Sequence, residues 1–245
     1  MKELIYANFK MNKTFSETKD YLKELDALLV DEPQKICLFL PYTSLYLSKL
    51  YKGEKFLFGA QNMFEEESGG YTGEISAPML ADLKVKTVML GHSDRKKFGE
   101  TNLQINKKIK TALRYGFQIV LCVGETRAQR NSGKTKIAIE KELGEILFGI
   151  YENELKNITI AYEPVWAVGT GKIADSKTIS EAVKFIRSTI NRLYSETAGK
   201  EIKIVYGGSI TPQTARDIYK NKNINGVLVG GTSLNAVEFA KLIKA

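Results

Sequence analysis

The chain contains little cysteine and almost no histidine. Its 245 residues include two cysteines, Cys37 and Cys122, and a single histidine, His92. Both cysteines lie inside apolar runs typical of strands, so we expect buried free thiols in a reducing compartment and no disulfide framework. Cys122 is more typical of packing than of a nucleophile, because the only histidine is distant in sequence. The scarcity makes His92 informative, since it is the one imidazole available for acid-base chemistry.

Long hydrophobic runs are also absent. No apolar stretch approaches the roughly 20 residues that a membrane helix needs. The N-terminal segment, residues 1–6, has neither the apolar length of a signal peptide nor a small-residue cleavage site. We therefore expect a cytoplasmic protein with no membrane partner.

Neither a low-complexity stretch nor a Pro/Ser-rich linker divides the chain. Hydrophobic residues make up 43% of it, which is enough for a sizeable core. We expect a single domain covering residues 1–245, although this length also suits two medium domains.

Acidic residues are fewer than basic ones: the chain has 36 Lys and Arg residues and 28 Asp and Glu residues, for a net charge of +8. The lysines are scattered over predicted helices without forming a block, and no basic-aromatic interleaving is present. We expect no nucleic-acid partner, although an accessory nucleic-acid role is an alternative that the charge alone supports. A positive field also attracts small anionic substrates.

Short apolar runs recur along the whole chain, separated by segments with helical spacing of apolar residues. Eight such runs are found: Leu4–Ala7, Ile36–Leu40, Phe56–Ala60, Thr87–Gly91, Ile119–Val123, Ile158–Tyr162, Ile202–Tyr206 and Gly226–Gly230. Local signals agree, because Thr211-Pro212 is typical of a helix start and Gly116 of the end of a helix that begins near Thr101. The pattern predicts an α/β fold with a single (β/α)8 barrel, and a doubly wound open sheet is the alternative.

In such barrels the chemistry lies in the loops that follow the strands. The unusual polar and glycine residues occur there: Asn8 and Lys10 after the first run, His92 and Asp94 after the fourth, Glu163 after the sixth, Ser209 after the seventh, and Gly230 and Gly231 after the eighth. We therefore expect these side chains and glycines to meet at one end of the barrel.

The segment that follows the sixth run is the most informative one. Glu163 stands at the end of a predicted strand, and an apolar stretch with glycines follows it, where an exposed loop is expected. We interpret this stretch as a lid over an acid-base site, formed by Pro164, Val165, Trp166, Ala167, Val168, Gly169, Thr170, Gly171 and Lys172.

These residue types fit one kind of chemistry. A carboxylate such as Glu163 is ionised at neutral pH and takes a carbon-bound proton. A neutral imidazole polarises a carbonyl group, and Lys10 stabilises developing negative charge as a fixed cation. Glycine-rich turns after the last two strands offer backbone N–H groups to a phosphate. The set indicates proton transfer beside a carbonyl in a small phosphorylated sugar.

The chain resembles the triosephosphate isomerase family over essentially its whole length. The matching segments are Asn8–Asn12, Ala60–Asn62, Tyr71–Ser76, Leu90–Arg95, Cys122–Thr126, Ala161–Lys172, Tyr206–Ser209 and Leu228–Leu234. They occur in the family's order and at its spacing, so the resemblance is specific.

The resemblance implies a role for each matched residue. Glu163 would be the general base, His92 the electrophile, and Lys10 with Asn8 would bind substrate oxygens, with Asp94 positioning them. More fully, the resemblance implies that Asp94 contacts Lys10 and helps to position His92 and the substrate. It further implies a phosphate site at Gly169, Ser209, Gly230 and Gly231, and a latch for the closed lid at Tyr206 and Ser209. The implied reaction interconverts dihydroxyacetone phosphate and glyceraldehyde 3-phosphate through an enediolate, with neither a metal nor an organic cofactor.

The loop over residues 61–76 is long for a connection between a strand and a helix. In the family this loop inserts into a second subunit, and the residue that matches Thr72 reaches toward the partner's active site. The resemblance therefore implies a homodimer. We expect the carboxylates of Glu65, Glu66 and Glu67, in the middle of the loop, to be solvated.

One departure from the family lies inside the site. Asp94 stands where the family usually has glutamate, and its side chain is one methylene shorter. A displacement of about 1 Å in a catalytic site can cost about 100-fold in rate. Contact with Lys10 then requires a local shift or a bridging water; otherwise turnover is low. The alternative function is a non-catalytic or weakly active sugar-phosphate-binding barrel.

Overall fold

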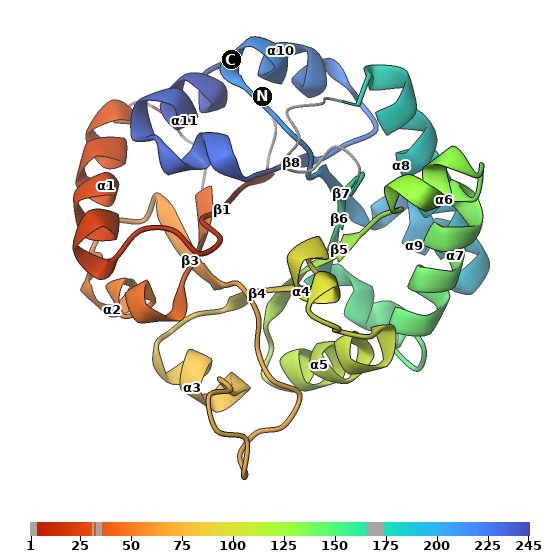
Figure 1. Cartoon of the computed structure of the whole chain (residues 1–245), viewed down its shortest axis with the longest axis horizontal. Helices are drawn as coiled ribbons and strands as arrows, with labels where there is room; N and C mark the ends of the chain where they lie inside the picture. The colour runs from red at the N-terminus through yellow and green to blue at the C-terminus, as the bar shows by residue number, and fades with distance from the viewer. Residues whose placement is uncertain (1–3, 31, 33–35, 166–173) are drawn as a thin grey trace.

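The computed structural model describes residues 4–30, 32, 36–165 and 174–245, and its centre is a closed barrel of parallel strands (Figure 1). The strands follow one another in chain order: β1 (Leu4–Asn8), β2 (Ile36–Leu40), β3 (Phe56–Ala60), β4 (Thr87–Leu90), β5 (Gln118–Val123), β6 (Ile158–Tyr162), β7 (Lys203–Tyr206) and β8 (Gly226–Val229). Pairing of β1 with β8, through Tyr6 opposite Leu228, closes the sheet. Closure confirms the predicted (β/α)8 barrel and excludes the open sheet.

Helices surround this barrel (Figure 1). The α-helices in the described ranges are α1 (Phe15–Leu28), α2 (Leu47–Leu50), α3 (Ala77–Asp82), α4 (Ser93–Lys97), α5 (Asn102–Arg114), α6 (Arg127–Asn131), α7 (Thr135–Ile146), α8 (Ser176–Leu193), α9 (Glu196–Glu201), α10 (Pro212–Lys220) and α11 (Ala236–Ile243). Short 3₁₀ helices occur at η1 (Tyr42–Ser44), η2 (Glu152–Asn157) and η3 (Gly231–Leu234).

The predicted helix boundaries follow local chemistry. Thr101 caps α5 through the N–H of Gln104, and the Gln104 side chain accepts from the Thr101 N–H, which is a capping box. Gly116 follows this helix at φ +68°, a left-handed conformation that glycine adopts without strain. Thr211 stands at the N-cap of α10, followed by Pro212.

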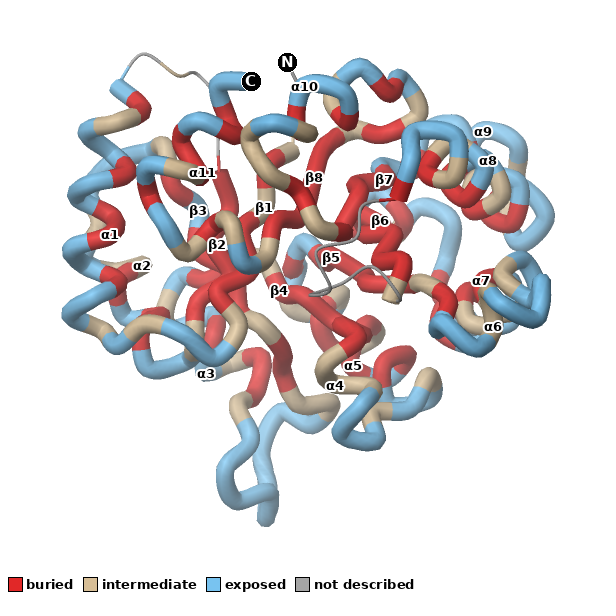
Figure 2. Tube along the Cα trace, turned by 45° about the horizontal axis from the view of Figure 1, so that its top comes forward, coloured by how far each residue is buried: buried red, intermediate tan, exposed pale blue. Residues whose placement is uncertain are grey.

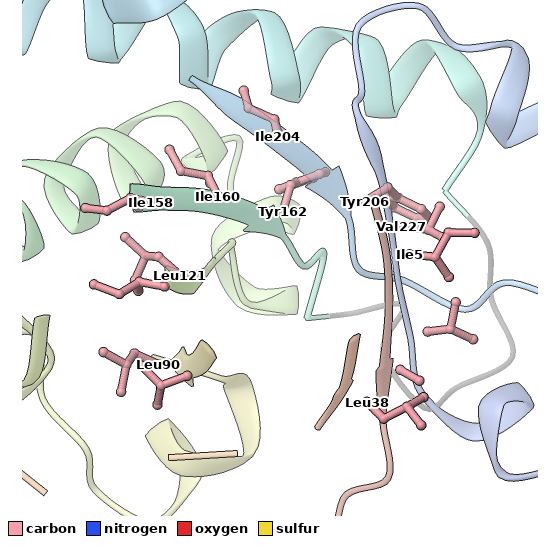
Figure 3. Close-up of a cluster of buried hydrophobic side chains, with 14 of the residues drawn as sticks. Ile5, Leu38, Leu90, Leu121, Ile158, Ile160, Tyr162, Ile204, Tyr206 and Val227 are labelled. Carbon is pink, nitrogen blue, oxygen red and sulfur yellow. The ribbon is translucent and has the colours of Figure 1, made fainter. Parts of the chain in front are cut away.

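The strands bury both of their faces. One set of side chains packs inside the barrel: Cys37, Phe39, Met89, Val120, Cys122, Ala161, Val205 and Leu228. The alternate positions pack outward against the helices; Figure 3 draws side chains of this cluster as sticks and labels Ile5, Leu38 and Ile204 among them. This two-residue alternation explains why the strands read as continuous apolar runs in the sequence.

Burial follows the same plan, with buried strands in the centre and exposed outer faces of the helices (Figure 2). The connection between β3 and α3 extends away from the barrel and is exposed over residues 66–74 (Figure 2). No helix within the described ranges is both long enough and apolar enough to cross a membrane.

Candidate active site

Strand alternation brings two of the predicted residues to the barrel mouth. Tyr6 and Ala161 face the barrel interior, so Asn8 and Glu163, each two residues further along, face the same way. A cavity of about 290 Å³ opens there. Its lining combines predicted catalytic residues with the glycine turns: Asn8, Lys10, His92, Glu163, Gly207, Gly208, Ser209, Ile210, Thr211, Leu228, Gly230, Gly231 and Thr232. Residues distant in sequence therefore share one small volume.

Lys10 is held in an unusual backbone conformation, with φ at +51°. Left-handed conformations are unfavourable for a residue with a side chain, by about 1–3 kcal/mol, and persist where neighbours enforce them. Two side chains do so here. Asn8 Oδ1 accepts from the Lys10 N–H at 2.8 Å, and Gln61 Nε2 donates to the Lys10 carbonyl at 2.8 Å. Asn8 thus orients Lys10, and Gln61 does so as well, a contact that the sequence did not indicate.

Asp94 reaches Lys10 directly despite its shorter side chain. Lys10 Nζ lies 2.8 Å from Asp94 Oδ2, and Lys97 Nζ lies 3.4 Å from the other oxygen. Partial burial by itself raises the pKa of Asp94, but the hydrogen bond from Lys10 and its positive charge outweigh it, together with contributions from His92 and Lys97, and the pKa lies below its usual 3.8. The expected gap between Asp94 and Lys10 is closed without a bridging water.

His92 is the N-cap residue of α4, and this position defines its tautomer. Its Nδ1 accepts a hydrogen bond from the Asp94 backbone N–H at 3.0 Å. A nitrogen that accepts a hydrogen bond carries no proton, so a neutral ring has its proton on Nε2. Nε2 lies 3.3 Å from Glu163 Oε1. The ring therefore presents an N–H donor to the cavity that it lines.

Glu163 is buried, with 3% of its surface exposed, yet its carboxylate is surrounded by polar groups. Its Oε2 accepts from the Ser93 N–H at 3.4 Å, and its backbone N–H donates to the Val123 carbonyl at 2.8 Å. Gly207 is needed beside it, because a Cβ there would lie 2.9 Å from Glu163 Cγ. The side chain is thus confined between β7 and the start of α4.

Cys122 packs as the sequence predicts, and it also has an unforeseen neighbour. Its thiol is buried beside the Glu163 carboxylate, and burial first, then the negative charge of Glu163, raises the pKa of this thiol well above its usual value. A protonated thiol is a hydrogen-bond donor to a carboxylate. Only the inward direction of Cys122, at the end of β5, could have indicated this contact.

The phosphate-binding candidates of the described chain belong to the same cavity. Ser209, Gly230 and Gly231 line it, and η3 begins at Gly231. The first N–H groups of a helix have no partner within the helix, so a helix start suits an anion. Gly208 allows the turn to pass over Tyr206, since a Cβ there would lie 2.1 Å from the Tyr206 hydroxyl.

Most of the predicted lid, from Trp166 to Lys172 and including Gly169, lies outside the described residues. Its flanks are described. Pro164 is buried, and the Val165 N–H donates to the Glu125 carbonyl at 3.2 Å. At the other flank the Ala174 N–H donates to the Tyr206 hydroxyl at 3.3 Å.

The 61–76 loop differs from expectation in its acidic middle. Glu65 is not solvated: its side chain is 13% exposed and pairs with Lys107 of α5 at 3.3 Å. Glu67 is exposed but accepts hydrogen bonds from Arg114, the last residue of α5, and from Tyr115, which follows it. The expectation was wrong for Glu65, because this residue faces the basic surface of α5, whereas Glu66 and Glu67 are exposed. Thr72 is exposed in the protruding part of the loop.

Comparison with known proteins gives one consistent family. A model of the family described as triosephosphate isomerase matches residues 3–245. A protein named triosephosphate isomerase from Dictyoglomus thermophilum is 44% identical over 247 aligned residues, which cover 100% of this chain and 99% of that protein. Proteins of the same name from Aquifex aeolicus and Thermoanaerobacter pseudethanolicus are 44% and 41% identical, with coverage of 98% or more of each chain.

Proposed function

The chain belongs to the triosephosphate isomerase family, and from this premise we propose a role for each residue at the barrel mouth. Its reaction is the intramolecular interconversion of dihydroxyacetone phosphate and glyceraldehyde 3-phosphate. The reaction moves a proton between two adjacent carbons and another between their oxygens, so one base and one donor serve both directions.

Glu163 is the base in this proposal. Its carboxylate removes the proton from the carbon beside the carbonyl group and returns it to the neighbouring carbon. Burial keeps water away from the carboxylate, while the Ser93 N–H gives it a hydrogen bond. The electrons of the broken C–H bond form an enediolate, whose charge develops on the former carbonyl oxygen.

His92 and Lys10 stabilise that charge. The Nε2–H of a neutral His92 donates to the substrate oxygens and exchanges a proton with them, since Nδ1 is already occupied by the Asp94 N–H. Lys10 supplies a fixed positive charge at the same cavity, and Asn8, Gln61 and Asp94 hold it there. Ser209, Gly230 and Gly231 bind the phosphate and thereby position the reacting carbons.

A single observation carries this proposal. Lys10, His92 and Glu163 come from three different strand ends, yet they line one cavity together with the glycine turns of β7 and β8. A sugar-phosphate sensor would need the phosphate site, but it would not need the contact between His92 Nε2 and Glu163 Oε1. A coupled isomerase assay of the wild-type chain separates the two functions, since a sensor binds triose phosphates without turnover.

Asp94→Glu tests whether the shorter carboxylate impairs the enzyme. We expect kcat to change by less than about 10-fold, because Asp94 already contacts Lys10 at 2.8 Å, so this contact does not need a longer side chain. Steady-state kinetics of both forms give the answer. A gain of about 100-fold would mean that the natural site is impaired, and would favour the weakly active barrel.

We also propose a homodimer that forms through the 61–76 loop. One large apolar side chain is exposed on this protruding loop, and others are exposed on α3, at the end of α4 and after β1. They are Met11 at 95%, Phe98 at 82%, Met79 at 55% and Tyr71 at 44% exposure. Burial against a second copy removes them from water.

Thr72→Arg tests the dimer. A long charged side chain at the loop tip has no partner in a tightly packed interface, so the mass in sedimentation should fall from twice 27.4 kDa toward the single-chain value. Ile137→Arg is the matched control, because Ile137 is 65% exposed on α7 and away from this loop. Equal masses for the two variants would contradict the proposed interface.

A cytoplasmic location completes the proposal. Cys37 and Cys122 are both free and buried, and thiols persist in this form in a reducing compartment.

A further inference from the structure

A partly buried ion pair outside the cavity connects the segments that carry the two proposed catalytic groups, His92 and Glu163. Lys96 of α4 contacts Glu142 of α7, and the side chains are 25% and 12% exposed. Lys96 Nζ also donates to the Cys122 carbonyl at 3.3 Å, and the Gly124 N–H donates to the other oxygen of Glu142 at 3.0 Å. The pair therefore joins α4 to the backbone at the end of β5.

Each end of this connection supports one of the two proposed catalytic residues, His92 or Glu163. On one side, α4 is a helix of only five residues, with His92 as its N-cap and Ser93 as its first residue. The Ser93 N–H contacts the Glu163 carboxylate, so a shift of α4 moves both the imidazole and this donor.

On the other side, the end of β5 supports the backbone of Glu163. The Val123 carbonyl accepts the Glu163 N–H at 2.8 Å. Gly124 packs so closely against Glu163 that a Cβ on it would lie 1.8 Å from the Glu163 carbonyl oxygen. Displacement of residues 122–124 is therefore transmitted to Glu163.

We propose that Lys96 and Glu142 are positioning residues for the isomerase reaction, which fix the separation of His92 and Glu163. This inference rests on the proposed roles of those two residues. It predicts a selective defect, because Lys96 and Glu142 do not line the cavity in which Ser209, Gly230 and Gly231 are found. The chemical step should suffer while phosphate binding does not.

Glu142→Gln in the full chain is the main test, since glutamine keeps the size of the side chain and removes its charge. We expect kcat to fall about 10-fold, from a displacement of a few tenths of an ångström at the reacting groups. KM and the inhibition constant of inorganic phosphate should change by less than about 2-fold. Lys96→Met should give the same pattern, and the double variant should lose little more than either single one, because both changes break one connection.

Lys141→Met is the matched control. Lys141 precedes Glu142 on α7, is 72% exposed and pairs with Glu145 at 3.8 Å, so its loss should leave kcat within about 2-fold of wild type. If Glu142→Gln does not fold, Glu142→Asp carries the same test, since it retains the charge but shortens the side chain.

Wild-type kcat in folded Glu142→Gln and Lys96→Met would overturn the inference, and so would an equal loss of kcat and phosphate affinity. Failure of the proposed function is a separate result. It would be seen as wild-type turnover that survives Glu163→Gln, whereas the positioning inference fails when turnover depends on Glu163 but not on the pair.

Discussion

Replacing Glu163 with glutamine is expected to lower kcat by about 1,000-fold or more, because a neutral amide cannot take a carbon-bound proton. Glutamine has nearly the same shape as glutamate and still accepts a hydrogen bond from the Ser93 N–H, which lies 3.4 Å from Glu163 Oε2 in the wild-type chain. The phosphate-binding candidates are untouched, so KM should change by less than about 3-fold. A coupled isomerase assay with varied substrate gives both constants.

Glu181→Gln serves as the control for this variant. Glu181 is exposed on α8 and pairs with Lys177 of the same helix at 4.0 Å, so its loss should leave kcat unchanged. Retention of more than about a tenth of wild-type kcat by Glu163→Gln would exclude this carboxylate as the base and move that role to another residue.

Lys10→Met is expected to lower kcat/KM by about 100- to 1,000-fold, since it removes the fixed cation that faces the developing negative charge. Methionine keeps most of the length of the side chain, so the cavity keeps much of its shape. The loss should be visible in kcat as well as in KM, because the charge on the substrate oxygen is greatest in the transition state.

Lys13→Met is an unusually close control. Lys13 lies in the same loop, also has a positive φ, at +67°, and stacks over the ring of Tyr21 with Nζ 4.9 Å from its centroid. It does not line the cavity. If both variants lose activity to the same extent, the effect belongs to the loop conformation and the role assigned to the Lys10 charge is wrong.

Lys10→Met is also expected to change the stability of the protein at low pH. The pKa of Asp94 lies below its usual 3.8 in the folded chain, so this group contributes stability that is present above the unfolded pKa. That contribution is lost as the pH falls through the folded pKa. Lys10→Met removes the main group that lowers this pKa, so the folded pKa moves back toward the unfolded value and less stability is lost across the acid range. Thermal unfolding midpoints of both forms across the acid range measure the shift.

The sequence by itself determined the succession of strands and helices and the position of the candidate site along the chain. Strands buried on both faces must read as apolar runs, and repetition of such runs with helices between them leaves few topologies. The direction of each strand side chain also follows from the sequence, because a residue two positions beyond an inward-facing one faces inward too. This local rule places Asn8 and Glu163 at the barrel mouth.

Only the tertiary structure decided which of these groups touch. The direct Lys10–Asp94 contact depends on how far apart β1 and α4 lie, and the pairing of Glu65 with Lys107 depends on how the loop folds against α5. The Lys96–Glu142 pair joins residues 46 positions apart, and neither belongs to a motif that the sequence singled out. Such contacts form between side chains that barrel closure brings together, and strand period and helix capping carry no information about distances across the fold.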